Sequence, residues 1–64
     1  MFKIDIKQTE ARGPNYKMYK AEVPFLPHVG NHMASDKDGF SGYVKHTMFW
    51  WNEKGKLTIE VEIK

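Results

Sequence analysis

Apolar residues alternate strictly with polar or charged residues at both ends of this chain. The alternation runs through residues 2–7 (FKIDIK) and again through residues 56–64 (KLTIEVEIK). Because successive side chains of a strand point to opposite faces of a sheet, both segments predict strands with one buried face. If the two strands are neighbours, the outward lysines of the first meet the outward glutamates of the second. We therefore expect the terminal strands to lie side by side and to close a small barrel.

One further strand and two irregular stretches follow the first strand. Gly13-Pro14 predicts a loop over residues 10–15 (EARGPN), and residues 16–23 (YKMYKAEV) predict a strand. Residues 24–30 (PFLPHVG) contain two prolines and a glycine, which predicts an irregular connection. Its three large apolar residues are expected to cover one end of the core: Phe25, Leu26 and Val29.

Two motifs of the form Asx-x-x-Gly divide the second half of the chain. They are DKDG at residues 36–39 and NEKG at residues 52–55. Asx at the first position and glycine at the last suit a type I turn followed by a left-handed glycine, so each motif predicts a hairpin. The strands that they join, at residues 29–35, 40–51 and 56–63, would form a meander. We therefore expect an all-β domain of five strands.

The NEKG turn predicts the register of the last hairpin. With Asn52 opposite Lys56, the side chains of Phe49 and Trp51 share a face with the alternating apolar residues of 56–64. We therefore assign Phe49 and Trp51 to the core. The residues between and before them, Met48 and Trp50, then point to the other face, where Thr58 and Glu60 also lie.

The strand over residues 40–51 is longer than most strands and cannot keep one register. An uninterrupted register would bring Lys45 into the core and turn Val44 outward. We therefore predict a bulge or sharp bend near residues 46–47, which lets Phe40 and Val44 point inward.

Three segments of the chain show a resemblance to a known kind of fold. Residues 27–33 (PHVGNHM), 38–44 (DGFSGYV) and 57–63 (LTIEVEI) resemble the SH3-like small barrels of the Tudor and KOW type. Met33 departs from the pattern, because a smaller β-branched residue is more usual there. The resemblance implies a five-stranded curled sheet or barrel, with an OB-like barrel as the alternative. It implies no particular ligand, since such barrels bind RNA, DNA or peptides, or only oligomerise.

Length and composition narrow the classes of protein. With 64 residues and no cysteine, the chain is expected to form one small domain without disulfides or a zinc-thiolate site. The net charge of +2 is spread along the chain, and no basic run points to nucleic acid or a membrane surface. The N-terminus does not resemble a signal peptide, and no apolar stretch has the length of a membrane span. We expect a cytoplasmic protein with no membrane partner.

No pattern in the chain predicts a reaction or a cofactor. His28 and His32 are four residues apart, a spacing that aligns metal ligands only on a helix, and His46 is remote in sequence. The DKDG motif lacks the further oxygen ligands of a calcium loop, and no serine lies in a nucleophile-elbow motif. We therefore expect no metal, no cofactor and no enzymatic activity.

Exposed aromatic side chains are the best candidate for a binding surface. Tyr16 and Tyr19 differ by three positions, so at least one of them faces outward. The predicted binding residues are Trp50, Met48, Tyr43, Tyr19, Tyr16 and Lys45.

The aromatic surface favours a protein-binding or homo-oligomerising module. The alternative is a single-stranded nucleic-acid binder, in which the rings stack on bases and lysines contact phosphates. The low net charge and the glutamates expected on the Trp50 face disfavour that alternative. A third possibility is purely structural, with residues 24–27 (PFLP) folded over Trp50.

Overall fold

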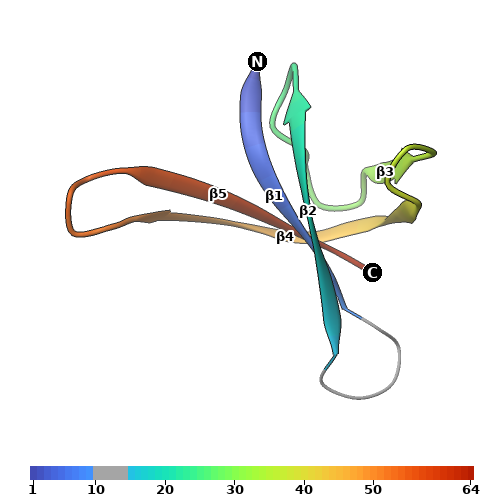
Figure 1. Cartoon of the computed structure of the whole chain (residues 1–64). Helices are drawn as coiled ribbons and strands as arrows, with labels where there is room; N and C mark the ends of the chain where they lie inside the picture. The colour runs from blue at the N-terminus through green and yellow to red at the C-terminus, as the bar shows by residue number, and fades with distance from the viewer. Residues whose placement is uncertain (10–14) are drawn as a thin grey trace.

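The computed structural model, described for residues 1–9 and 15–64, is an all-β domain with no helix in those residues (Figure 1). Its strands are β1 (Phe2–Thr9), β2 (Tyr16–Val23), β3 (His32–Ser35), β4 (Phe40–Trp51) and β5 (Leu57–Ile63). They form one sheet in the order β2-β1-β5-β4-β3, which curls into a half-barrel. The predicted five-stranded fold and the C-terminal meander are confirmed. The loop predicted at residues 10–15 lies outside the described residues except for Asn15.

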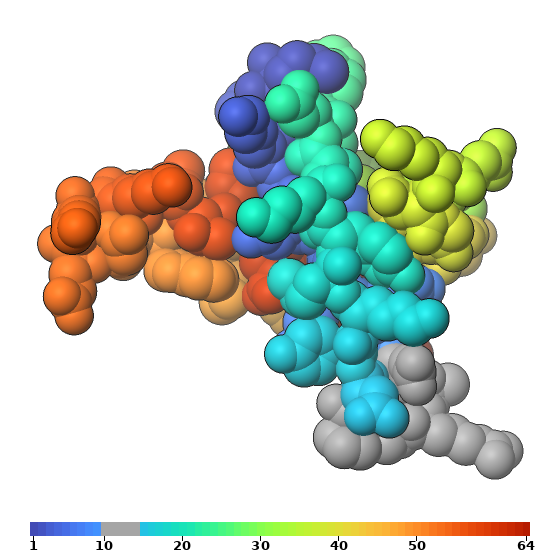
Figure 2. All heavy atoms as spheres, in the orientation of Figure 1, coloured from blue at the N-terminus to red at the C-terminus, as the bar shows by residue number. Residues whose placement is uncertain are grey.

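The terminal strands are neighbours, as predicted, and they run parallel. Pairing joins Asp5–Gln8 of β1 to Glu60–Ile63 of β5 and extends no further. The expected pairing of opposite charges occurs for Lys7 beside Glu62, whereas Asp5 lies beside Glu60. Beyond these pairs the β1–β2 hairpin and the β4–β5 hairpin diverge, so that the β4–β5 end stands away from the rest of the molecule (Figure 2).

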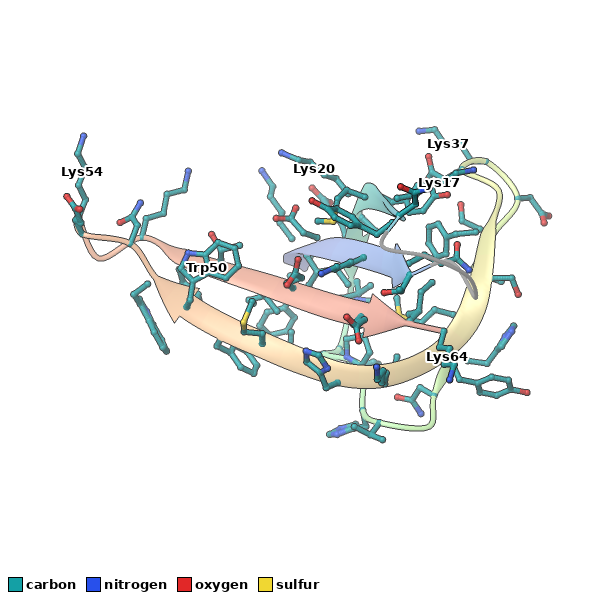
Figure 3. All side chains as sticks on the ribbon, turned by 90° about the horizontal axis from the view of Figure 1, so that it is seen from below. Lys17, Lys20, Lys37, Trp50, Lys54 and Lys64 are labelled. Carbon is teal, nitrogen blue, oxygen red and sulfur yellow. The ribbon has the colours of Figure 1, made fainter. Side chains whose placement is uncertain are left out.

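The predicted bulge in β4 lies at Lys45, directly before the expected position. Val44 pairs with Ile63, and the next pair joins His46 to Glu62. Lys45 Nζ and His46 Nδ1 lie 3.3 Å and 3.6 Å from the same Glu62 Oε2, so both side chains point to the outer face. The extra residue changes the alternation of faces and accompanies the bend of β4 that curls the sheet (Figure 3).

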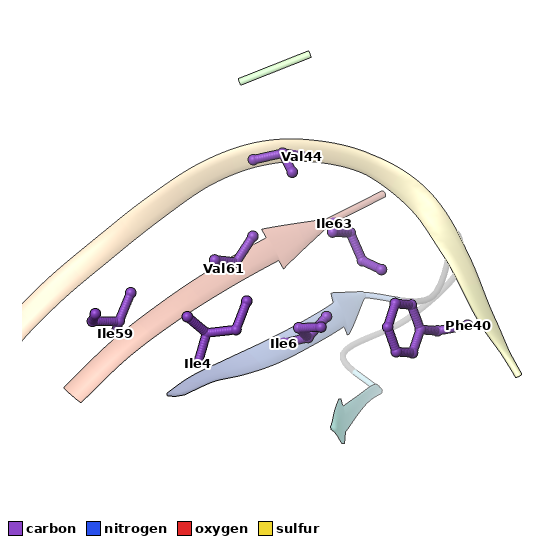
Figure 4. Close-up of a cluster of buried hydrophobic side chains, with 7 residues drawn as sticks. All are labelled: Ile4, Ile6, Phe40, Val44, Ile59, Val61 and Ile63. Atoms are coloured by element: carbon purple, nitrogen blue, oxygen red, sulfur yellow. The ribbon is translucent and has the colours of Figure 1, made fainter. Parts of the chain in front are cut away.

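The core lies on the concave inner face, around the crossing of the two hairpins (Figure 4). It consists of seven buried side chains: Ile4, Ile6, Phe40, Val44, Ile59, Val61 and Ile63. Alternate residues in the middle of β1 and the second half of β5 contribute, as their alternating sequences predict, whereas Phe2 and Leu57 at the starts of these strands are exposed. Five partly buried residues pack against this cluster: Tyr19, Ala21, Val23, Leu26 and Met33.

The last hairpin has the predicted register but not the predicted burial. Trp51 pairs with Leu57 and Phe49 with Ile59, as expected. However, Phe49 is 45% exposed and Trp51 is 63% exposed, so their assignment to the core is wrong. The reason is that the pairing of β1 with β5 begins only at Asp5 and Glu60, and among the described residues no strand pairs with the β1 side of β5 before Glu60.

The turn at NEKG forms as predicted. Asn52 Oδ1 accepts hydrogen bonds from the backbone N–H groups of Lys54 and Lys56, each at 2.9 Å. The backbone N–H of Asn52 donates to the carbonyl of Lys56 at 2.9 Å, and Gly55 has a left-handed φ of 81°. Residues 53–55 are therefore the three-residue loop with a glycine bulge that the motif indicates.

The turn at DKDG is longer by one residue, and a different side chain caps it. Ser35 pairs with Phe40, so all four residues of the motif lie in the loop. Ser35 Oγ accepts from the N–H of Asp38 at 3.1 Å, and Gly39, at a φ of 80°, donates its N–H to the Ser35 carbonyl at 2.8 Å. The motif places Asp36 at the first position of the turn, but the turn begins at Ser35, whose hydroxyl lies within reach of the Asp38 amide.

The segment between β2 and β3 covers the core with one residue only. Leu26 packs against the cluster, as predicted. Phe25 and Val29 are 80% and 72% exposed, so the prediction that they cover the core is wrong. Gly30 has a φ of 93°, which reverses the chain before β3 and turns Val29 outward.

We expect the free energy of unfolding to depend on Ile6 far more than on Trp51. Ile6→Ala removes a fully buried side chain and should cost about 2–5 kcal/mol. Trp51→Ala removes a largely exposed ring and should cost less than about 1 kcal/mol. Denaturant unfolding at a concentration where the chain is monomeric checks both values, and equal losses would contradict the observed core.

The two Asx-x-x-Gly turns should respond differently to the loss of their first side chain. Asn52→Ala removes two hydrogen bonds and should speed amide exchange in the β4–β5 hairpin by roughly fivefold or more. Asp36→Ala should leave exchange in the β3–β4 hairpin unchanged, because Ser35 caps that turn. Hydrogen exchange followed by NMR measures both, and a large effect of Asp36→Ala would contradict the capping by Ser35.

Candidate interaction surface

The β4–β5 hairpin beyond the core exposes large apolar side chains on both faces. We call this part, residues 48–60, the arm. Met48 and Trp50 lie on the outer face, opposite Glu60 and Thr58, and Figure 3 shows Trp50 near the end of the hairpin. The exposed apolar residues of the arm are Met48 (39%), Phe49 (45%), Trp50 (43%), Trp51 (63%) and Leu57 (41%).

The two tryptophans lie on different faces of the arm, and neither is part of the core. Trp50 points outward, as predicted, and Trp51 points to the inner side, yet both are exposed. Since Trp50 is 43% exposed, residues 24–27 do not cover it, and that structural explanation is wrong. Neither ring contributes to the buried core.

The arm is a two-stranded ribbon with a free edge on each side. On the β1 side, residues 57–59 of β5 have no strand partner. On the other side, the pairing of β3 ends at Tyr43, and Val44 exchanges hydrogen bonds with Asn31 and Gly30. Thr47 Oγ1 donates to the Pro27 carbonyl at 3.4 Å, and within the described residues no strand pairs with the same edge of β4 beyond it. An isolated two-stranded ribbon is only marginally stable in water.

Charges are placed at the tip and the base of the arm but not along β4. Residues 47–52 (TMFWWN) contain no charged side chain, whereas the turn carries Glu53 and Lys54. On the outer face, Glu60 lies opposite Met48, and Glu62 follows at the base. The outer face around Trp50 therefore carries both signs of charge, because Lys56, opposite Asn52, shares this face with Glu60.

Tyr43 and Tyr16 are exposed, as predicted, but they lie apart from the arm. Tyr43 is on the β3–β4 side, with its ring 4.9 Å from that of His32 and nearly edge-on to it. Tyr16 begins β2, and Lys7 Nζ lies 4.7 Å from the centre of its ring. In Figure 1 the start of β2, the β3–β4 turn and the end of the arm point in three different directions. The structure therefore does not bring the predicted aromatic residues into one patch.

Tyr19 and Lys45 do not fit a free binding surface. The Tyr19 ring is only partly exposed, packs against the core and lies 4.9 Å from the Phe40 ring. Tyr19 pairs with Ile6 of β1, so it belongs to the buried face. Lys45 is exposed, but its Nζ pairs with Glu62.

The sequence-based prediction missed Phe49, Trp51 and Leu57 as surface residues. Alternation places them correctly on the inner face, and it says nothing about whether that face is covered. The informative signal was the length mismatch between the six-residue alternation at the start of the chain and the long hairpin at its end. β1 pairs with only four residues of β5, so it covers only part of a hairpin whose first strand has 12 residues.

A groove of about 450 Å³ lies where β1 leaves the arm. Its apolar lining comes from Ile4, Ala21, Leu57 and Ile59, and its rim carries both lysines and carboxylates. The mixed charges give this groove no preference for an anion or a cation.

The described residues show little that could support chemistry. They contain no group of three or more His, Cys, Asp or Glu side chains placed to hold a metal ion. Ser41 Oγ and His32 Nε2 lie 3.1 Å apart on the exposed outer face, and among the described residues no carboxylate forms an ion pair with His32. Across residues 1–9 and 15–64, no helix has the length and apolar character needed to cross a membrane.

Fold and surface define a small all-β domain, with a mixed five-stranded half-barrel and a projecting aromatic arm. Comparison with protein-family models, curated proteins and solved structures gave no match. The resemblance to SH3-like barrels stays a prediction.

Both tryptophans should be accessible to solvent in the monomer, and Trp51 should be the more accessible. The chain has two tryptophans, so Trp50→Phe and Trp51→Phe each leave a single fluorophore. The Trp50→Phe variant reports on Trp51, and the Trp51→Phe variant reports on Trp50. We expect acrylamide to quench the fluorescence of Trp51 more strongly, because Trp51 is 63% exposed and Trp50 is 43% exposed. A Trp51 that is shielded in the dilute monomer would contradict the open inner face of the arm.

Proposed function

We propose that this protein is a non-catalytic interaction module that binds another polypeptide chain, in the simplest case a second copy of itself, through the arm. The observation that carries the proposal is the exposure of five large apolar side chains on both faces of the arm. Contiguous apolar surface on a small domain usually marks an association site. A ribbon of two strands also needs further contacts to be stable, and a partner chain supplies them.

Single-stranded nucleic acid is the alternative ligand, and the charges around the arm argue against it. Stacking on Trp50 would place phosphates near Glu60 as well as Lys56, with Glu62 further along the same face. Lys45, one of the lysines expected to meet phosphate with Lys17 and Lys20, is paired with Glu62. Nucleic-acid affinity depends mainly on neutralising phosphate charge, which this face does not favour.

Sedimentation of the wild type and of Trp51→Glu across a wide concentration range tests the proposal. The wild type should shift from monomer toward a larger species, and Trp51→Glu should stay monomeric, because a buried carboxylate would oppose the contact. Phe25→Glu is the matched control, since Phe25 is 80% exposed but lies outside the arm. It should associate like the wild type.

A wild type that stays monomeric at the highest concentration would overturn self-association. Titration with a single-stranded oligonucleotide at low and moderate salt separates the alternative. Binding that weakens with salt and is lost in Trp50→Ala would favour nucleic acid over a protein partner.

A further inference from the structure

The free edges of the sheet differ in how well they are protected against pairing with another strand. Natural edge strands are protected by charges, prolines, bulges or short length. β2 carries Lys17, Lys20 and Glu22, and β3 has only four residues. The outer part of β4, residues 47–51, has no charge, proline, glycine or bulge. This edge is therefore less protected than the edges formed by β2 and β3.

The backbone groups at this edge alternate in direction. The N–H of Asn52 bonds to Lys56 of β5, while the N–H and carbonyl of Val44 bond away from β5, to Asn31 and Gly30. In an antiparallel ladder, bonded residues alternate with residues whose groups point the other way. Counting back from Asn52, the outward groups belong to Trp51, Phe49 and Thr47. Thr47 Oγ1 bonds to the Pro27 carbonyl, so residue 27 lies beside the edge at Thr47, and the open donors and acceptors beyond it are those of Phe49 and Trp51.

From these observations, and resting on the proposed function, we infer that two copies join edge to edge through β4. The strands run antiparallel about a two-fold axis at Trp50, so that Phe49 of each copy pairs with Trp51 of the other. This register uses all four open groups of each copy and forms four backbone hydrogen bonds. It ends where the copy's turn begins at Asn52 and where Pro27 covers Thr47.

Edge pairing also explains why both faces of the arm are apolar. Contact through one face would leave the side chains of the other face in water. Edge pairing makes a four-stranded sheet in which both faces gain neighbours. On the outer face, Trp50 of one copy lies beside Trp50 of the other, and on the inner face, Phe49 of one copy lies beside Trp51 of the other. Aromatic cross-strand pairs of this kind stabilise sheets.

The surface available suits a weak, concentration-dependent dimer. The exposed parts of the five apolar side chains of the arm amount to on the order of 500 Å² per copy, since a large ring presents 150–250 Å² when free. Two copies then bury at most about 1,000 Å², the lower end of specific interfaces. We therefore expect an equilibrium between monomer and dimer rather than a permanent dimer.

Disulfide cross-linking tests the register, because the chain has no cysteine of its own. In Trp50→Cys the two thiols of a dimer would face each other in a non-hydrogen-bonded pair, with about 4.5 Å between Cα atoms, which suits a disulfide. Mild oxidation should give a covalent dimer. Thr58→Cys is the control: Thr58 lies opposite Trp50 on β5, and its copy would be about 14 Å away across three strand spacings.

Backbone pairing is tested separately from side-chain packing by Trp51→Pro and Trp51→Ala. The N–H that proline lacks at this position points away from β5, so the hydrogen bonds between β4 and β5 remain intact. Circular dichroism checks that the variant is folded. Trp51→Pro should associate at least tenfold more weakly than Trp51→Ala, since each dimer loses two hydrogen bonds. Equal association of the two variants would overturn the edge pairing.

The outcomes separate this inference from the proposed function. If Trp51→Glu abolishes a wild-type dimer but Trp50→Cys does not cross-link, association through the arm stands and the edge-to-edge register fails. Preferential cross-linking of Phe49→Cys would move the two-fold axis by one residue and overturn the stated register. If the wild type forms no dimer, both self-association through the arm and the edge-to-edge register are overturned.

Discussion

The parallel pairing of Asp5–Gln8 with Glu60–Ile63 is the constraint on which the rest of this structure depends. It is the only strand pairing that joins the β1–β2 hairpin to the other described strands. The buried side chains Ile4, Ile6, Val61 and Ile63 gather around it, and Phe40 and Val44 reach it because the bulge at Lys45 bends β4 over the crossing. The core is therefore concentrated at this crossing, whereas the sheet extends well beyond it.

The aromatic arm follows directly from the shortness of that pairing. β4 and β5 continue past the crossing, while β1 turns away with β2, so the part of the chain that the structure describes leaves Phe49, Trp51 and Leu57 exposed. The chain thus keeps its two largest side chains outside its core and uses mainly isoleucine and valine inside it. In a domain this small, withholding both tryptophans from the core costs stability that a partner chain can restore. The projecting arm and the modest core are therefore two consequences of one topology.

Local rules predicted a large part of this fold. The alternation at both ends, the NEKG turn and the need to keep Lys45 out of the core located three strands, one register and one bulge. Each of these inferences depends on residues close in sequence or paired through a tight turn. The inference about the DKDG turn was less accurate, because two neighbouring side chains, Ser35 and Asp36, compete for the same backbone amide, and Ser35 binds it. The candidate surface was predicted in part: Trp50 and Met48 are exposed as expected, whereas Tyr19 is part of the packed face.

The sequence by itself determined which residues share a face, because side chains alternate along a strand and a three-residue turn leaves one register. Only the tertiary structure decided which of those faces is covered, because coverage depends on where a distant strand runs and where it stops. Tyr19 and Trp51 show the difference, since both lie on the inner face. Tyr19 meets Phe40 across the crossing and is packed, while Trp51 extends past the end of the β1 pairing and remains exposed.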